Sequence, residues 1–271
     1  MLFRSVAAPV VAPIVLATNI PEQLEVVEWA DAIYTFTSRG GGLKSVQLKR
    51  YLETVGCDQS GSTNLFATLN DHAKVPVFAM QADDAFGDNH FKLTRASASS
   101  ITAEKVLPSG LRVLKQFDLG SNYLIAARVR FDNPSAQTVT LPAQQLNIGT
   151  ATPMGPRDPM TTMGVFWFNG EKAEHVEQPW FEGGAGCSKK VPRLEYTTVG
   201  TNRILWAAVH NQFFSMTVVP STNAVGAQFV THRIDLPRPT AQAIAADSKI
   251  TKEPIGLEAS ISYPEIGRAH V

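Results

Sequence analysis

The stretch TSRGGGLKSVQLKRY, from Thr37 to Tyr51, is the part of the chain that best indicates its fold. Just before it, residues 32–36 (AIYTF) alternate along a strand and are rich in β-branched and aromatic side chains. Gly40, Gly41 and Gly42 permit the positive φ angles that a tight reversal requires. A second alternating run follows them. The stretch therefore predicts a β-hairpin that begins a large sheet, with the three glycines as its structural turn.

A glycine-rich turn can also bind a phosphate group, which is the functional alternative for this stretch. Phosphate loops lead into the N-terminus of a helix, where free backbone N–H groups contact the anion. The residues after the glycines instead continue as a strand, with Lys44, Lys49 and Arg50 offered to solvent. The sequence thus favours the plain hairpin.

Composition excludes several classes of protein and site. The chain has 271 residues, of which 44% are hydrophobic, so it can bury one large core or two small ones. The net charge is zero, which leaves no electrostatic footprint for nucleic acid. No HExxH, GxSxG or CxxC spacing occurs. The sequence accordingly predicts no catalytic residue, no metal and no cofactor.

Both ends of the chain are expected to lie outside the folded domain. Residues 1–5 (MLFRS) and 265–271 (EIGRAHV) resemble translations of a sequencing adapter, and the second interrupts a strand pattern after Pro264. Residues 6–21 are apolar but contain three prolines, which fits an Ala/Pro linker better than a membrane-spanning helix. The expected domain is therefore 22–264, truncated at its C-terminal end, from a gene that continues in both directions.

Two cysteines, Cys57 and Cys187, lie far apart in the sequence. They could form one disulfide if the compartment is oxidising and their Cβ atoms meet. Two free thiols are the alternative, and the sequence leaves both open.

Short strand patterns separated by turn signals continue to the end of the chain. Asn169-Gly170 is the strongest hairpin signal, and residues 204–220 (ILWAAVHNQFFSMTVVP) predict two central strands or one bent strand. Residues 233–236 predict another short strand, residues 237–246 a loop or short helix, and residues 255–263 a last strand. With turns every ~8–12 residues and little helix, the pattern predicts an all-β sandwich of two large sheets.

Three segments, in their order along the chain, resemble the periplasmic domain of the YidC family of membrane-protein insertases. They are residues 38–41 (SRGG), the Leu146-x-x-Gly149 strand end, and residues 206–220. The resemblance implies a large antiparallel β-supersandwich similar to galactose mutarotases. It also implies a location on the periplasmic side of the bacterial inner membrane, in a parent protein anchored by transmembrane helices.

The same resemblance implies a function and a set of partners. YidC-type proteins assist the insertion and folding of inner-membrane proteins, alone or with the Sec translocon and its accessory subunits. Their insertase chemistry belongs to transmembrane helices, and none of those residues is present in this sequence. The domain is therefore expected to dock or scaffold without catalysis, with the translocon, its accessory subunits and nascent inner-membrane proteins as partners.

Two alternative functions remain open. A mutarotase-like sugar epimerase would use a histidine as general acid and a carboxylate as base, for which His210 with Glu177 or Glu182 are the candidates. A carbohydrate-binding module would instead need exposed aromatic side chains, which would come from Trp167, Phe168, Trp180, Phe181 and Trp206.

Four residues are the predicted binding residues. Trp180 and Phe181 lie beside a glycine-rich loop and are the pair expected to be exposed. Trp206 and His210 lie in the most apolar run of the chain, where His210 could equally be a hydrogen-bonded core residue.

Overall fold

The computed structural model describes residues 14–17, 19–53, 65–82, 84–183, 191–198, 202–221, 224–264 and 266–269. These residues form twenty β-strands, two short α-helices and one 3-10 turn. Every pairing between named strands is antiparallel. The predicted all-β antiparallel fold is therefore confirmed, but the expectation of two large sheets is wrong, because the strands form four main sheets. Cys57 and Cys187 lie outside the described residues, so their pairing stays a prediction, as do the predicted domain limits.

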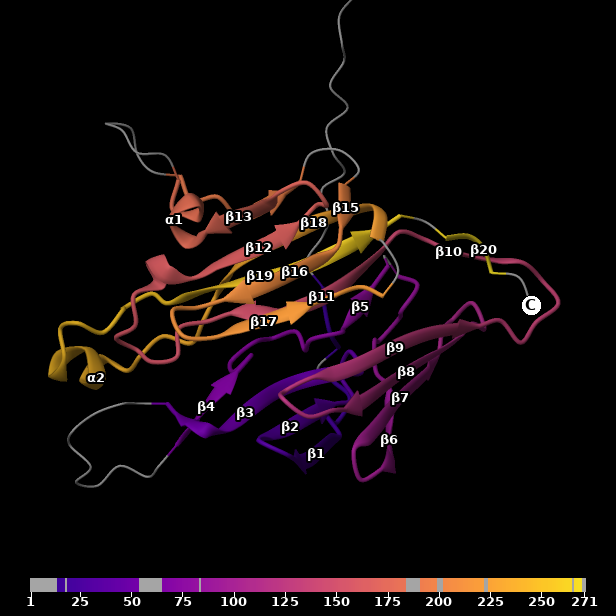
Figure 1. Ribbon diagram of the computed structural model, residues 1–271, viewed down its shortest axis with the longest axis horizontal. Helices are drawn as coiled ribbons and strands as arrows, with labels where there is room; N and C mark the ends of the chain where they lie inside the picture. The colour runs from indigo at the N-terminus through magenta and orange to yellow at the C-terminus, as the bar shows by residue number, and fades with distance from the viewer. Residues whose placement is uncertain are drawn as a thin grey trace, which may run out of the picture.

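The N-terminal half is a sandwich of two four-stranded sheets, in the lower part of Figure 1. Both sheets are meanders, in which each strand pairs with the next one along the chain. The first sheet contains β1 (Leu24–Trp29), β2 (Ala32–Thr37), β3 (Gly42–Leu52) and β4 (Phe66–Leu69). The second sheet contains β6 (Lys92–Ser97), β7 (Ser100–Val106), β8 (Arg112–Leu119) and β9 (Ile125–Asp132).

The C-terminal half is a second sandwich, in the upper part of Figure 1. The third sheet has the order β14-β18-β19-β11-β5, with β15 also paired to β18, and the fourth sheet has the order β13-β12-β16-β17. The third sheet contains β5 (Met80–Gln81), β11 (Gln144–Ala151), β14 (Glu195–Thr197), β15 (Asn202–Ile204), β18 (Ala224–Asp235) and β19 (Ile255–Tyr263). The fourth contains β12 (Gly164–Phe168), β13 (Ala173–Glu177), β16 (Trp206–His210) and β17 (Ser215–Val218).

Few elements lie outside these four sheets. The remaining ones are β10 (Val139–Leu141), which pairs with β20 (Ile266–Ala269), the 3-10 turn η1 (Met160–Thr162), α1 (Gln178–Phe181) and α2 (Ala241–Ala246). The side chain of Thr240 caps α2 by accepting a hydrogen bond from the N–H of Ala243. No helix among the described residues is long and apolar enough to cross a membrane.

Each sandwich has its own hydrophobic core. In the first, Phe36 from β2 and Phe117 from β8 meet with their ring centroids 5.1 Å apart. In the second, Trp167 from β12 stacks on Phe229 from β18 at 4.8 Å. Aromatic pairs of this kind add to the free energy gained by burying their apolar surface. The two cores fix four sheets into one β-supersandwich.

The predicted hairpin is the pair β2–β3, and its three glycines fit where a larger residue would not. Gly40 and Gly41 have φ angles of +73° and +56°, a region that L-residues rarely adopt. A Cβ on Gly41 would lie 2.4 Å from the Phe91 ring, and one on Gly42 would lie 2.1 Å from the Val77 carbonyl oxygen. The turn therefore packs tightly against two other segments of the chain.

A buried lysine joins this turn to the second sheet. Lys115 on β8 is completely buried, and its ammonium donates hydrogen bonds to the carbonyl oxygens of Gly40 (2.7 Å) and Phe78 (2.8 Å). The Phe91 ring lies 4.3 Å from the same nitrogen. Lys115 forms no ion pair with any described residue, and burial lowers the pKa of its ammonium to about 7.

The C-terminal strand predictions are confirmed with two corrections. Residues 204–220 contain the two strands β16 and β17, but only β16 is central, because β17 lies at the edge of the fourth sheet. Residues 255–263 form β19. The Asn169-Gly170 turn connects β12 to β13. The short strand predicted at residues 233–236 is wrong in extent, because β18 runs for 12 residues from Ala224 to Asp235. Gly226 and the polar residues that alternate along it weaken the strand signal in the sequence.

Candidate functional site

The outer face of the fourth sheet carries aromatic side chains where a solvated face is usually polar. Along β12, Val165 and Trp167 point into the second core, so Phe166 and Phe168 occupy the opposite face. Along β16, Ala207 and Val209 point into the core, which places Trp206 and His210 on the same outer face. We call Phe166, Phe168, His175, Trp206 and His210 the aromatic face.

The rings of this face contact one another across the strands. Phe168 and Trp206 are paired across β12 and β16, with nearly parallel rings whose centroids are 6.2 Å apart. Phe166 stacks on His210 at 4.4 Å with an angle of 22° between the ring planes, and it also meets His175 of β13 at 5.8 Å. Four of the five side chains are half-buried, and His175 is exposed.

A glycine makes room for the stack. Gly164 lies directly opposite His210 in the β12–β16 ladder, and a Cβ built on it would lie 2.7 Å from His210 Nε2. Because no side chain fills this position, the imidazole can lie over the backbone of β12 and reach Phe166. The local sequence GVFWF thus sets the position of the histidine ring.

Burial favours the uncharged form of His210. The loss of water around the imidazole lowers its pKa below the ordinary histidine value, although the Asn211 carbonyl and the Glu177 carboxylate act in the opposite direction. Its Nδ1 lies 3.3 Å from the Asn211 carbonyl oxygen, and its Nε2 has no hydrogen-bond partner among the described residues. The negative charge that acts on this ring is therefore the Glu177 carboxylate.

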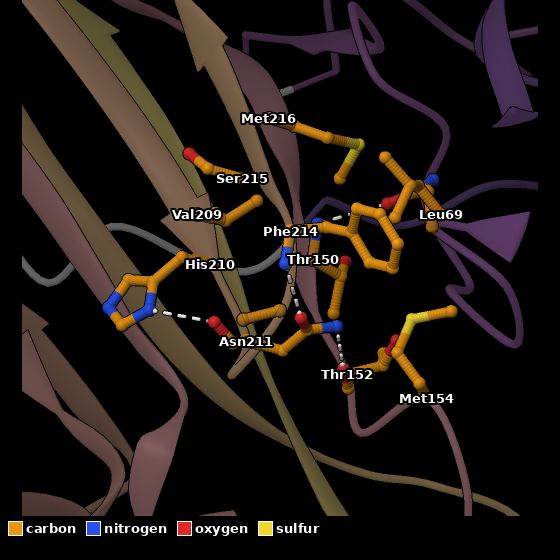
Figure 2. Close-up of a pocket in the computed structure, with 12 residues that line it drawn as sticks. Leu69, Thr150, Thr152, Met154, Val209, His210, Asn211, Phe214, Ser215 and Met216 are labelled. Atoms are coloured by element: carbon orange, nitrogen blue, oxygen red, sulfur yellow. Dashed lines mark hydrogen bonds between the residues drawn. The ribbon is translucent and has the colours of Figure 1, made fainter. Parts of the chain in front are cut away.

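A small hollow lies beside His210, at the turn between β16 and β17 (Figure 2). Its volume is about 10 Å³, roughly the space of one water molecule. Asn211 spans it by donating to the Thr152 carbonyl at 3.0 Å and accepting from the N–H groups of Phe213 and Phe214 at 2.9 Å. Figure 2 shows the His210 ring turned away from the hollow. The Asn211 side chain therefore anchors the turn, and the hollow has no room for a larger ligand.

A wider cleft of about 190 Å³ adjoins the hollow and shares Thr152 and Met154 with it. A cavity of about 150 Å³ can hold one benzene molecule, so this cleft has room for a single apolar side chain. Its walls combine apolar residues, five of them prolines, with polar ones such as Glu53, His72 and Asp158, and the apolar residues are the more numerous. They include Pro153, Met154, Pro156, Leu236, Pro237, Pro239 and Pro254.

The structure brings together two of the four predicted binding residues. Trp206 and His210 both lie on the aromatic face. Trp180 and Phe181 lie elsewhere, on α1, and the expectation that both are exposed is wrong for Phe181, which is completely buried. Its ring fills the second core, while Trp180 is half-buried and packs edge-on against it at 4.9 Å. Whether any of the four binds a ligand stays a prediction.

The two carboxylates considered as partners of His210 have different surroundings. Glu177, the last residue of β13, is paired with Gly164 of β12, and Gly164 is paired on its other side with His210 of β16. Glu177 and His210 therefore lie on the same rung of the sheet. Glu182 follows α1 and accepts a hydrogen bond from the Gln178 side chain at 3.0 Å. Of these two carboxylates, only Glu177 influences the pKa of His210.

Phe166 and His175 are the members of the aromatic face that sequence reasoning missed. A signal was present, because GVFWF is apolar at both odd and even positions, and a strand with one solvated face should alternate. His175 follows from the strong Asn-Gly turn, which fixes the register of β13 against β12 and places it opposite Phe166.

A second group of titratable residues crosses the third sheet. Glu195, His232 and Glu258 are cross-strand neighbours on β14, β18 and β19, with His232 Nδ1 3.8 Å from a Glu195 carboxylate oxygen. Burial raises the pKa of Glu258 to about 7 and lowers that of His232. Neither here nor elsewhere in the described part of the chain do three or more His, Cys, Asp or Glu side chains gather to hold a metal ion.

The YidC periplasmic domain family matches residues 31–255, a span that includes strands of all four sheets but ends before most of β19. This chain belongs to that family. As a YidC periplasmic domain it is part of a membrane protein and lies on the periplasmic side. No curated protein matches the sequence.

Three solved structures resemble this YidC periplasmic domain at low sequence identity. A candidate aldose 1-epimerase from Escherichia coli K12 is 11% identical, with a TM-score of 0.38 over 91% of this chain and 100% of that one. A galactose mutarotase related enzyme from Lactobacillus acidophilus is 10% identical, with a TM-score of 0.44 over 91% and 86%. A galactose mutarotase-like protein from Lactobacillus casei is 10% identical, with a TM-score of 0.36 over 88% and 87%.

Proposed function

We propose that this chain is the periplasmic docking domain of a membrane-protein insertase and foldase, and that it performs no catalysis itself. The observation that carries the proposal is the family match, which extends over both sandwiches rather than one short motif. In this role the domain helps its parent protein to insert and fold inner-membrane proteins, alone or with the Sec translocon.

The partners follow from the same proposal. They are the Sec translocon with its accessory subunits and the nascent inner-membrane proteins that the parent protein receives. The parent protein is anchored in the bacterial inner membrane, and this domain faces the periplasm.

A binding measurement tests the docking role. The 271-residue chain would be immobilised, and purified Sec translocon with its accessory subunits, in lipid nanodiscs, would be passed over it. We expect saturable binding, and empty nanodiscs of the same lipids serve as the control. Equal responses from loaded and empty nanodiscs would contradict docking to the translocon.

The enzymatic alternative is tested in the same preparation. A mutarotase-like epimerase would accelerate the interconversion of α- and β-galactose, which polarimetry follows directly. We expect the rate with the chain to equal the uncatalysed rate. Acceleration that disappears in a Glu177→Gln variant would replace the proposed function with an epimerase.

A further inference from the structure

The aromatic face differs from the corresponding outer face of the second sheet, which gives an internal comparison. There, charged side chains form ion pairs between Arg112 and Glu104 at 2.6 Å and between Arg128 and Asp118 at 2.8 Å. Such a charged surface is typical of a sheet face that is exposed to solvent. On the fourth sheet the equivalent positions of β12 and β16 carry Phe166, Phe168, Trp206 and His210 instead.

Charge is nearly absent from this surface. The four strands of the fourth sheet contain no lysine or arginine, and their only acidic residues are Glu174 and Glu177, both on the edge strand β13. Apolar patches on a protein surface mark sites where another molecule covers them. An uncharged aromatic surface matches an uncharged, apolar partner and would leave a charged partner without its water or an opposite charge.

The arrangement of the rings narrows the choice of partner. Phe166 and His210 each turn one ring face toward the other, which leaves only the second face of each ring for a sugar to stack on. A membrane surface would attract basic side chains, and these strands have none. A polypeptide segment needs only an apolar contact area that is long enough for a few of its residues, and the aromatic face forms such a strip.

The strip has the length of a short peptide. Trp206 and His210 are four residues apart on β16, which is about 13 Å along a strand. The rings from β13 to β16 cover two strand spacings, or about 10 Å, across it. Four residues of an extended chain would lie along this strip.

We propose that the aromatic face docks an uncharged, apolar segment of a client polypeptide. This inference rests on the proposed function, because it names the surface and the partner chemistry by which the domain would meet a nascent membrane protein. The docking is weak and reversible, since the strip is small compared with a stable protein–protein interface.

A defined peptide tests the inference. The probe is a fluorescein-labelled, N-acetylated 12-residue peptide that alternates Leu or Val with Ser or Thr, and the control peptide has Asp in place of two leucines. Fluorescence anisotropy with the 271-residue chain should show saturable binding of the first peptide and at least about tenfold weaker binding of the second.

Matched variants locate the binding. The triple variant Phe166→Thr, Phe168→Thr and Trp206→Thr keeps residues that favour strands, and it should weaken binding at least about tenfold. Val26→Thr is the control, because Val26 is a 55% exposed apolar residue of the first sheet, and its variant should bind as the wild type does. Far-UV circular dichroism verifies that each variant is folded.

Several results would overturn the inference. They are a folded triple variant that binds within twofold of the wild type, no binding of the apolar peptide by the wild type, and dimerisation through this face in sedimentation experiments. If the triple variant does not fold, the binding site is located on the wild-type chain by NMR, using a spin-labelled peptide that broadens the amide signals near it. Broadened amide signals in β12 and β16 support the inference, and their absence contradicts it.

These outcomes are separate from those of the proposed function. Loss of peptide binding while the chain still binds the Sec translocon would reject the aromatic face and keep the docking role. Peptide binding without translocon binding would keep the aromatic face as a peptide site and reject docking to the translocon.

Discussion

Replacing Lys115 by methionine should remove a specific part of the pH dependence of stability. In the folded protein the lysine ammonium is completely buried and has two carbonyl acceptors but no carboxylate. Burial lowers its pKa to about 7, whereas an unfolded chain would hold the proton up to the ordinary value of 10.5. Between these two pH values the unfolded state therefore binds more protons than the folded state.

The sign and size of the effect follow from this difference. Where the unfolded state binds more protons, the free energy of unfolding rises with pH. The folding equilibrium should change up to about tenfold for each pH unit above 7, so the wild type should gain about 2 kcal/mol between pH 7 and pH 9. Lys115→Met should lack this rise. It should also be less stable at pH 9, because the Gly40 and Phe78 carbonyls lose a donor that contributes about 1 kcal/mol each.

Urea unfolding followed by tryptophan fluorescence at pH 6, 7, 8 and 9 measures both effects. Lys92→Met serves as the control, since Lys92 is an exposed lysine of β6 and its removal should leave the rise intact. If Lys115→Met and the wild type gain the same stability between pH 7 and pH 9, the buried ammonium is not the group that titrates, and the reasoning fails.

Three further predictions concern other buried or crowded positions. Gly41→Ala should lower stability by several kcal/mol because its Cβ would clash, whereas Gly110→Ala, with positive φ but open space, should cost only about 1 kcal/mol; thermal unfolding compares them. Glu258→Gln should abolish a fall in stability as pH rises from 4.5 to 7, because the folded carboxyl has its pKa raised to about 7 and binds the extra proton there; urea titrations over that range would show an unchanged fall if Glu258 is not responsible. Gly164→Ala should push the His210 ring away from its stack and raise its pKa toward the ordinary value, and NMR titration showing an unaltered pKa would contradict this.

Local patterns in the sequence were sufficient for most of the strands. The glycine turn at residues 40–42, the Asn169-Gly170 turn and the run at residues 255–263 each combine strand formers with a turn signal over a few residues. The bulge in β3 was not predicted: the structure shifts register between Thr35 and Phe36 of the partner strand, and the matching sign in the sequence is that Leu43 and Val46 are three positions apart rather than two.

The buried lysine and the aromatic face could not be placed in the same way. Lys115 lies between Val113 and Phe117 on the core side of β8, which hints at burial, but its acceptors come from segments up to 75 positions away in the chain. The stacking partner of His210 is also distant in the sequence, because Phe166 belongs to another strand of the fourth sheet. Period-two patterns give the face of a residue, while such contacts depend on which strands become neighbours.

The position of β19 has a consequence for the order in which the protein can fold during synthesis. The first two sheets consist of consecutive strands, so each can pair as soon as its own residues have reached the periplasm. In the third sheet, β19 lies between β18 and β11, and it is the last of those strands to be made. Until residue 263 has emerged, β18 and β11 each keep an unpaired edge that could recruit another chain. The N-terminal sandwich can therefore form early, whereas the C-terminal one closes in a single late step.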